Sequence, residues 1–183
     1  TAFKADVLAR QGVARVEDLA TNYHGLLMAE GERLTTNAYR EARSGVAAAL
    51  ARQQARVALT GVVSPYVAMR LASIALSGSG MAHSDDFERQ AEDHRYALVQ
   101  HLNGLHAEAV SWADDRYEST GGSSAAPSRK RIDAEHWEGA PTFAYRAPPA
   151  SLAMSEAAGG ISALAAWLAA LAVAAARLRP RVV

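Results

Sequence analysis

Residues 157–176 read AAGGISALAAWLAALAVAAA, a run of twenty residues without a charged side chain. At a rise of about 1.5 Å per residue, a helix of this length spans about 30 Å, the thickness of the hydrocarbon core of a bilayer. Arg177, Arg179 and Arg181 follow at once, as the positive-inside rule expects at a cytoplasmic end, and we assign them a membrane-anchoring role. We therefore expect a transmembrane helix at 157–176 and a cytoplasmic basic tail at 177–183.

The apolar content of this run leaves a soluble alternative open. Most of its residues are alanine, and its strongly apolar aliphatic residues are Ile161, Leu164, Leu168, Leu171 and Val173. Together these contribute about −1.5 to −3 kcal/mol on a membrane-insertion scale, so an alanine-rich helix that packs on a soluble core is the alternative. Small residues at Gly159 and Ala163, and again at Ala166, Ala170 and Ala174, favour the membrane, because they let helices approach closely in lipid.

The composition bounds the class of protein. The chain has 183 residues, half of them hydrophobic, with 19 basic and 19 acidic residues and no cysteine. This length suits one domain with a real core, and the missing cysteines exclude disulfide scaffolds and thiolate metal sites. A net charge of zero argues against a nucleic-acid-binding protein. By position, residues 1–156 carry 16 bases and 19 acids, whereas the tail carries three bases. This asymmetry predicts that residues 1 to about 156 are extracytoplasmic.

Apolar residues spaced three and four apart predict an all-α helical bundle in the extracytoplasmic part. Ala2–Gln11 is expected to be a short helix, and Thr35 or Thr36 is expected to cap a long helix that ends near Gly61. Ser64-Pro65 starts the next helix. One helix of about 85–117 is expected to follow, with Asp85 and Glu88 in capping-box spacing. A helix of this length is typical of an arm of an antiparallel bundle.

The chain is therefore divided into five regions. They are an extracytoplasmic helical domain (1–118), a flexible Ser/Gly/Pro-rich loop (119–131), an extended return segment (132–156), the transmembrane helix and the basic tail. The return segment carries Trp137, Phe143 and Tyr145, and such aromatic residues are favoured at a membrane surface.

The densest polar cluster surrounds the start of the 85–117 helix and includes His83, Asp86 and His94. These residue types bind divalent metals or transfer protons, so they are candidate ligands of a metal-dependent hydrolase. The main interpretation is structural, because acids in a first helical turn are favoured by the helix dipole. The sequence has no phosphate-binding loop, nucleophile elbow, zinc signature or dinucleotide fingerprint. We therefore predict no enzyme activity and no cofactor.

Several motifs of this sequence are similar to those of one protein family. They are Asn22-Tyr23-His24-Gly25, Gln53-Gln54-Ala55-Arg56, Val63-Ser64-Pro65-Tyr66-Val67-Ala68, Leu71–Ser79, and His83, Phe87, Ala91-Glu92, Arg95, Leu98-Val99 and Leu102-Asn103. They resemble bacterial type-two ABC-transporter permease subunits, which have a large extracytoplasmic domain of unknown function and are often described as related to components for multicopper-enzyme maturation. The resemblance covers about residues 13–110 and resumes at 143–181. The sequence departs from this pattern at Ser77-Gly78-Ser79 and in the Ser/Gly/Pro-rich loop.

This resemblance implies the C-terminal portion of a permease subunit in the bacterial inner membrane. Its partners would be cytoplasmic ATP-binding subunits and other permease helices in an oligomeric complex, and the ATP site would lie on separate polypeptides. The chain begins at Thr1 without an apolar leader, so we expect it to be a piece of a longer polypeptide. The alternative is a soluble all-helical interaction or sensor module in which the alanine-rich helix packs on the bundle.

Overall fold

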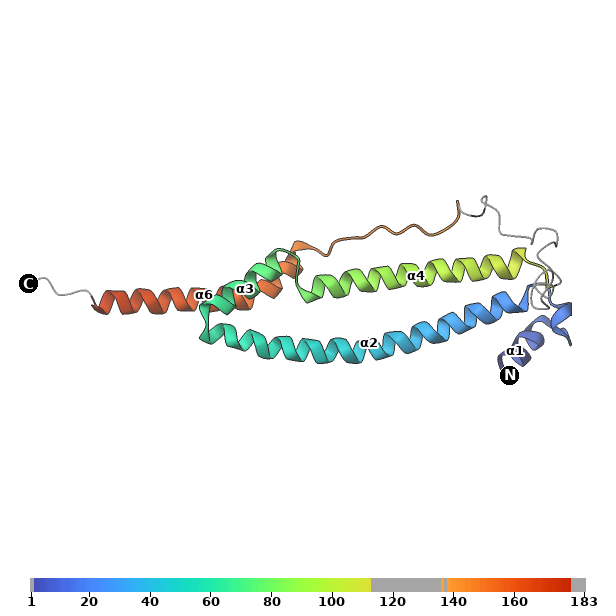
Figure 1. The fold of residues 1–183 in the computed structure, drawn as a ribbon, viewed down its shortest axis with the longest axis horizontal. Coiled ribbons are helices and arrows are strands. Elements are labelled where there is room, and N and C mark those ends of the chain that lie inside the picture. The colour runs from blue at the N-terminus through green and yellow to red at the C-terminus, as the bar shows by residue number, and fades with distance from the viewer. Residues whose placement is uncertain (1, 113–135, 137, 179–183) are drawn as a thin grey trace, which may run out of the picture. The chain divides into compact units, whose positions relative to one another are not determined.

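The computed structural model describes residues 2–112, 136 and 138–178, and these residues form an all-α fold without a strand (Figure 1). The elements are α1 (Ala2–Gln11), a short 3₁₀ helix η1 (Val16–Asp18), α2 (Tyr23–Val63), α3 (Pro65–Leu76), α4 (Met81–Ala109) and α6 (Ala150–Leu178). The predicted fold class is confirmed. The predicted helices at 2–11 and after Ser64-Pro65 are also confirmed, and proline at the first helical position suits a site whose amide has no partner.

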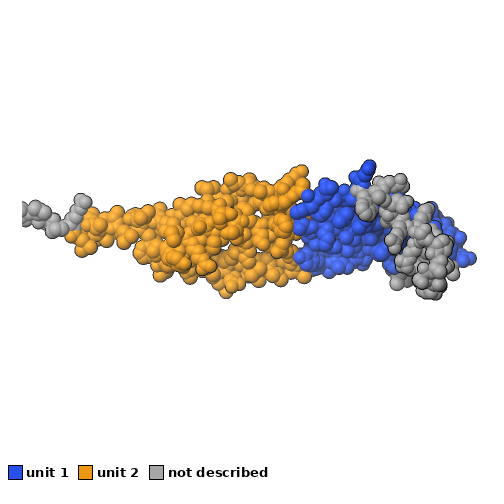
Figure 2. All heavy atoms as spheres, turned by 45° about the horizontal axis from the view of Figure 1, so that its top comes forward, with its two compact units in different colours: residues 1–40, 91–143 blue, residues 41–90, 144–183 orange. Residues whose placement is uncertain are grey.

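The chain forms two compact units, coloured separately in Figure 2. Unit 1 consists of Thr1–Arg40 and Ala91–Phe143, and unit 2 consists of Glu41–Gln90 and Ala144–Val183. Each unit is therefore built from two stretches that are distant in sequence, and both α2 and α4 contribute residues to both units.

In unit 1, Asn22 connects the start of α2 to the end of α4. Its side-chain Oδ1 accepts a hydrogen bond from the His24 N–H at 2.8 Å, which makes Asn22 the N-cap of α2. Its Nδ2 donates to the Val110 carbonyl at 3.2 Å, and its backbone N–H donates to the Ala107 carbonyl at 2.7 Å. Asn22 is 3% exposed. One buried side chain thus satisfies unpaired groups at two helix ends.

The capping position of Asn22 corrects the prediction that α2 starts at Thr35 or Thr36. The helix begins at Tyr23 and continues for 41 residues. The Thr36 hydroxyl lies inside it, 1% exposed, and donates to Glu32 Oε1 at 2.9 Å instead of capping an amide. Gly61 is also inside the helix, two residues before its end, so the predicted C-terminal stop is wrong by a few residues.

The helix predicted at about 85–117 is α4, and both of its predicted ends are wrong. It begins at Met81, directly after the Ser77–Gly80 turn, so Asp85 and Glu88 lie beyond its start and pair with Arg43 of α2 within unit 2. It ends at Ala109, and the Val110 and Ser111 carbonyls that follow accept hydrogen bonds from Asn22 Nδ2. Residues 113–117 lie outside the described part of the chain.

The core of unit 1 joins α1, η1 and the first turn of α2. Val7, Val16 and Tyr23 are buried together, and Phe3, Leu8, Leu19, Leu26 and Trp112 pack around them. The Phe3 and Tyr23 rings have centroids 6.3 Å apart. Because these residues come from three separate elements, their burial fixes the N-terminal segment onto the start of α2.

In unit 2, α3 lies along the N-terminal half of α6 (Figure 1). The contact is made by small side chains, and Ala68, Ala72 and Ala75 of α3 are buried together with Ala157 of α6. Alanines at these positions lie on one face of α3, because they recur three and four residues apart. Their small size allows the two backbones to approach closely.

The predicted flexible loop at 119–131 and Trp137 lie outside the described residues. Part of the predicted return segment is described: residues 140–149 contain no helix, and α6 starts at Ala150. In unit 1 the ring centroids of Phe143 and His94 lie 5.3 Å apart. In unit 2 Tyr145 packs edge-on against Phe87, and their ring centroids lie 5.4 Å apart. The boundaries of the five regions remain predictions.

Candidate functional site in α6 and its contact with α3

Helix α6 is long and apolar enough to cross a membrane. It has 29 residues, and none of its apolar 18-residue window is buried within the described structure. Leu168, Leu171 and Val173 are 68%, 59% and 52% exposed. At about 1.5 Å per residue, the helix is about 43 Å long, so it exceeds the hydrocarbon core by about two turns. One helix in the described part of the chain therefore has the length and composition of a membrane span.

The two ends of α6 differ in charge. Glu156 is the last acidic residue of the sequence and lies in the second turn, whereas Arg177 lies in the last turn. The predicted anchoring residues Arg179 and Arg181 lie outside the described residues. An arginine at a helix C-terminus is favoured by the helix dipole as well as by anionic headgroups.

Gly160 is the point of closest approach between α6 and α3. A Cβ atom placed there would lie 2.7 Å from the Ala68 carbonyl oxygen and 3.1 Å from the Ala72 Cβ. Gly159, the next residue, would meet nothing within 4 Å. Further along α6, Trp167 Nε1 donates a hydrogen bond to the Val62 carbonyl at 3.0 Å and so satisfies a carbonyl at the end of α2. Two contacts, at Gly160 and at Trp167, therefore hold α6 against α3 and the end of α2 within unit 2.

A largely apolar groove of about 820 Å³ opens between α2, α3 and α6 within unit 2. Its walls are alanines, glycines and aliphatic side chains, including Val57, Leu59 and Ile74. The only ionisable residue among the described lining residues is Glu156. Its side chain is 29% exposed, and its Oε2 lies 3.9 Å from His83 Nδ1, which is too long for a hydrogen bond.

The candidate metal ligands have separate partners. His83 lies beside Glu156 and the Gly78 turn, and Asp86 pairs with Arg89 and accepts a hydrogen bond from Gln90 at 2.6 Å, all in unit 2. His94 stacks on Phe143 in unit 1. In the ranges that the structure describes, no three His, Asp or Glu side chains form a group able to hold a metal ion.

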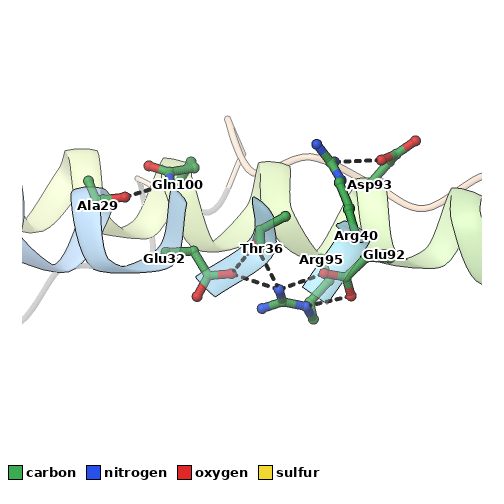
Figure 3. Close-up of polar contacts among 8 residues, drawn as sticks. All are labelled: Ala29, Glu32, Thr36, Arg40, Glu92, Asp93, Arg95 and Gln100. Carbon is green, nitrogen blue, oxygen red and sulfur yellow. Dashed lines mark hydrogen bonds and ion pairs between the residues drawn. The ribbon is translucent and has the colours of Figure 1, made fainter. Parts of the chain in front are cut away.

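The main polar network of unit 1 surrounds Arg95 (Figure 3). Its Nη2 donates to Glu32 Oε1 and to Glu92 Oε1, each at 2.7 Å, and lies 3.3 Å from the Thr36 hydroxyl. Hydrogen bonds from Arg95 and then from Thr36 hold the pKa of Glu32 below its ordinary value, and the carboxylates raise the pKa of Arg95. The network fastens α2 to α4 by charge within unit 1.

The lowered pKa of Glu32 predicts an acid-sensitive contact. A depressed carboxyl pKa contributes stability above the unfolded-state value, and this contribution is lost as the pH falls through the folded-state value. We expect Glu32→Gln to lower the free energy of unfolding at pH 7 by about 0.5–1 kcal/mol, because Arg95 is partly exposed. The difference should shrink below pH 4. Urea unfolding at both pH values measures it, and the exposed Glu108→Gln is the control.

Sequence patterns alone missed four residues of these contacts. Asn22 occurs in a quoted motif together with Gly25, where an added Cβ would lie 2.5 Å from the Ala107 backbone nitrogen of α4. Nothing in the motif indicates that either residue contacts the end of α4. Gly160 and Glu156 had a local signal, because a glycine inside a helix and the last acid before an uncharged run are both unusual. The residues that contact them could not be inferred from this signal.

The comparisons with known proteins place most of the chain in a family. The family model described as Domain of unknown function (DUF3526) matches residues 1–146, which include unit 1, residues 41–90 of unit 2 and part of the segment before α6. No curated protein and no solved structure matches the chain.

Proposed function

The chain belongs to the DUF3526 family of domains of unknown function, and on this premise we propose that it is the non-catalytic C-terminal portion of a bacterial type-two ABC-transporter permease subunit. In this proposal, residues 1 to about 156 form an extracytoplasmic helical domain, and α6 is the last transmembrane helix. The subunit works in the inner membrane with other permease helices and with cytoplasmic ATP-binding subunits, and it moves a substrate without itself hydrolysing ATP.

The observation that carries the proposal is the exposed apolar surface of α6. If α6 were a core helix of a soluble module, its stripe of Leu168 and Leu171 would be covered, but both side chains are more than half exposed. Exposed apolar residues such as these are favourable when lipid or other membrane helices surround the helix. The small-residue contact with α3 and the Arg177 end support the same placement.

Charge placed in the middle of α6 tests the membrane placement. We expect Leu168→Arg to move the full chain from the membrane fraction to the soluble or aggregated fraction, because arginine at mid-span costs about 2.5–3.5 kcal/mol. Membrane flotation after expression in bacteria measures this, with an expected loss of at least tenfold. Ser151→Arg is the matched control, because Ser151 is exposed on the same helix outside the uncharged run.

The position of Trp167 distinguishes the proposal from a soluble interaction or sensor module. In a chain with Trp112→Phe and Trp137→Phe, brominated acyl chains should quench the remaining Trp167 strongly. A chain that keeps only Trp112 is the control and should not be quenched. A soluble monomer with unquenched Trp167 would contradict the membrane proposal and favour the soluble module.

The transporter assignment needs its own experiment. We expect a tagged native protein, extracted in detergent, to co-purify with an ATP-binding subunit that hydrolyses ATP. A membrane-bound chain that never recovers such a subunit would disprove the transporter assignment, while leaving the membrane placement intact.

A further inference from the structure

The groove of unit 2 has one polar end and one apolar end. At the polar end, the Gln54 side-chain amide contacts the Met81 sulfur, and Gly80 lies beside the Glu156 carboxylate. At the other end, the lining residues Val62 and Ala163 lie near the contact between Trp167 and the end of α2. Along α6 the groove therefore runs from Glu156 toward the middle of the apolar run.

The groove is long, and its walls are apolar. Its α2 wall runs from Leu50 to Val62, which is about 18 Å of helix. The volume of the groove, about 820 Å³, lies within the range of about 300–1000 Å³ found for small-molecule sites. An extended hydrocarbon chain matches both the length and the apolar walls.

The charge at the polar end of the groove determines which chemical group of the occupant binds there. Glu156 is the only ionisable described residue that lines it, and Gln53 and Gln54 are its other polar residues at the same end. A carboxylate near a low-dielectric wall attracts an ammonium and repels a phosphate or carboxylate. His83 Nδ1 makes no hydrogen bond within the described structure, and it lies 3.9 Å from Glu156 Oε2.

We propose that this groove binds an acyl chain of a membrane lipid whose headgroup carries an ammonium, with that ammonium at Glu156 and the chain directed toward Ala163. The direction agrees with the entry of α6 into a bilayer, since Glu156 precedes the uncharged run of α6 and Ala163 lies within it. Burial of its methylene groups supplies the affinity of the acyl chain, and Glu156 supplies the selection of the headgroup. The proposal rests on the membrane placement of α6, and it is independent of the ATP-binding partners.

The experiment measures binding of fluorescent lipids to the detergent-solubilised full chain. We expect phosphatidylethanolamine labelled on its acyl chain to bind about tenfold tighter than the matching phosphatidylglycerol. Glu156→Gln should remove this preference, because it removes both the attraction for the ammonium and the repulsion of phosphatidylglycerol. Equal affinities of the unaltered chain for the two lipids would overturn the assignment of the headgroup.

Blocking variants test the acyl-chain site. Ala58→Trp and Ala55→Trp each place a large ring in the groove from an exposed position of α2, and both should weaken the binding of both lipids about tenfold or more. Ala48→Trp, also exposed on α2 but outside the groove, is the matched control. Unchanged lipid binding in both blocking variants, with helical content preserved by circular dichroism, would overturn the site.

The same variants separate this proposal from its alternatives. If light scattering shows a dimer that Ala58→Trp dissociates, the groove binds a second copy and the lipid proposal is wrong. If the chain binds lipid but never enters vesicles, the lipid site stands and the proposed membrane span fails. If the chain enters vesicles but binds neither lipid, the membrane span stands and the lipid site fails.

Discussion

Replacing Gly25 by alanine is expected to destabilise unit 1 by about 1–3 kcal/mol, since added volume in a packed contact forces the backbone to move. A Cβ at this position would lie 2.5 Å from the Ala107 backbone nitrogen and 2.6 Å from its Cα. These are atoms of the α4 backbone, so no side-chain rotation relieves the overlap. The Ala107 carbonyl also accepts the hydrogen bond from the Asn22 N–H, so a shift of α4 disturbs the connection between the two helices.

Gly31→Ala in the same helix is the matched control and should have the opposite effect. A Cβ at Gly31 meets nothing within 4 Å, so alanine there should stabilise the helix by about 0.5–1 kcal/mol. Thermal and urea unfolding followed by circular dichroism measure both variants. If the two substitutions change the midpoint in the same direction, the close approach of α2 to α4 at Gly25 is wrong.

The second large effect is expected at Gly160, where alanine should weaken the contact between α3 and α6 by about 1–3 kcal/mol. The added Cβ would lie 2.7 Å from the Ala68 carbonyl oxygen, which belongs to the backbone of α3. In lipid, close packing of small residues is a main source of helix association, so separating the two backbones removes much of the contact.

Gly159→Ala tests the same helix one residue earlier, where a Cβ meets nothing within 4 Å. It should leave the contact with α3 unchanged. Thermal unfolding in detergent measures both variants, and the emission of a sole Trp167 reports the local geometry, because its indole binds the Val62 carbonyl. A stable Gly160→Leu variant with unchanged Trp167 emission would refute the α3–α6 contact.

The helical class could be predicted from spacing alone, but the start of α2 could not. Asn22 and Thr36 are both residues that cap helices, and local sequence does not decide between them. Helix α2 begins after Asn22 because Asn22 binds two carbonyls at the end of α4. These carbonyls belong to Ala107 and Val110, which are 85 or more residues away in sequence. The end of α4 could not be predicted for the same reason. The Asn22 side chain, which binds the Val110 and Ser111 carbonyls just after Ala109, is far away in sequence.

The apolar character of α6 was predictable from composition, but its contact with α3 was not. The sequence indicated small faces at Gly159 and Ala163 and at Ala166, Ala170 and Ala174, whereas the structure uses Ala157 and Gly160. In a helix made mostly of alanine, every face is small, so residue size does not identify the face that a partner covers. The face of α6 that is covered is the one that packs on Ala68, Ala72 and Ala75 of α3.

Because each unit consists of two separate stretches of sequence, neither unit can complete its fold before its second stretch has been synthesised. Residues 1–40 of unit 1 emerge from the ribosome before the whole of 41–90, and their partners follow only from Ala91 onward. At about 5–20 residues per second, Asn22 waits roughly 4–18 s for the Ala107 and Val110 carbonyls. During that interval Val7, Val16 and Tyr23 also lack Trp112, which packs against them in the complete unit. Chaperones should therefore bind most often to nascent chains that extend beyond Arg40 but do not yet include the second stretch of unit 1, which begins at Ala91.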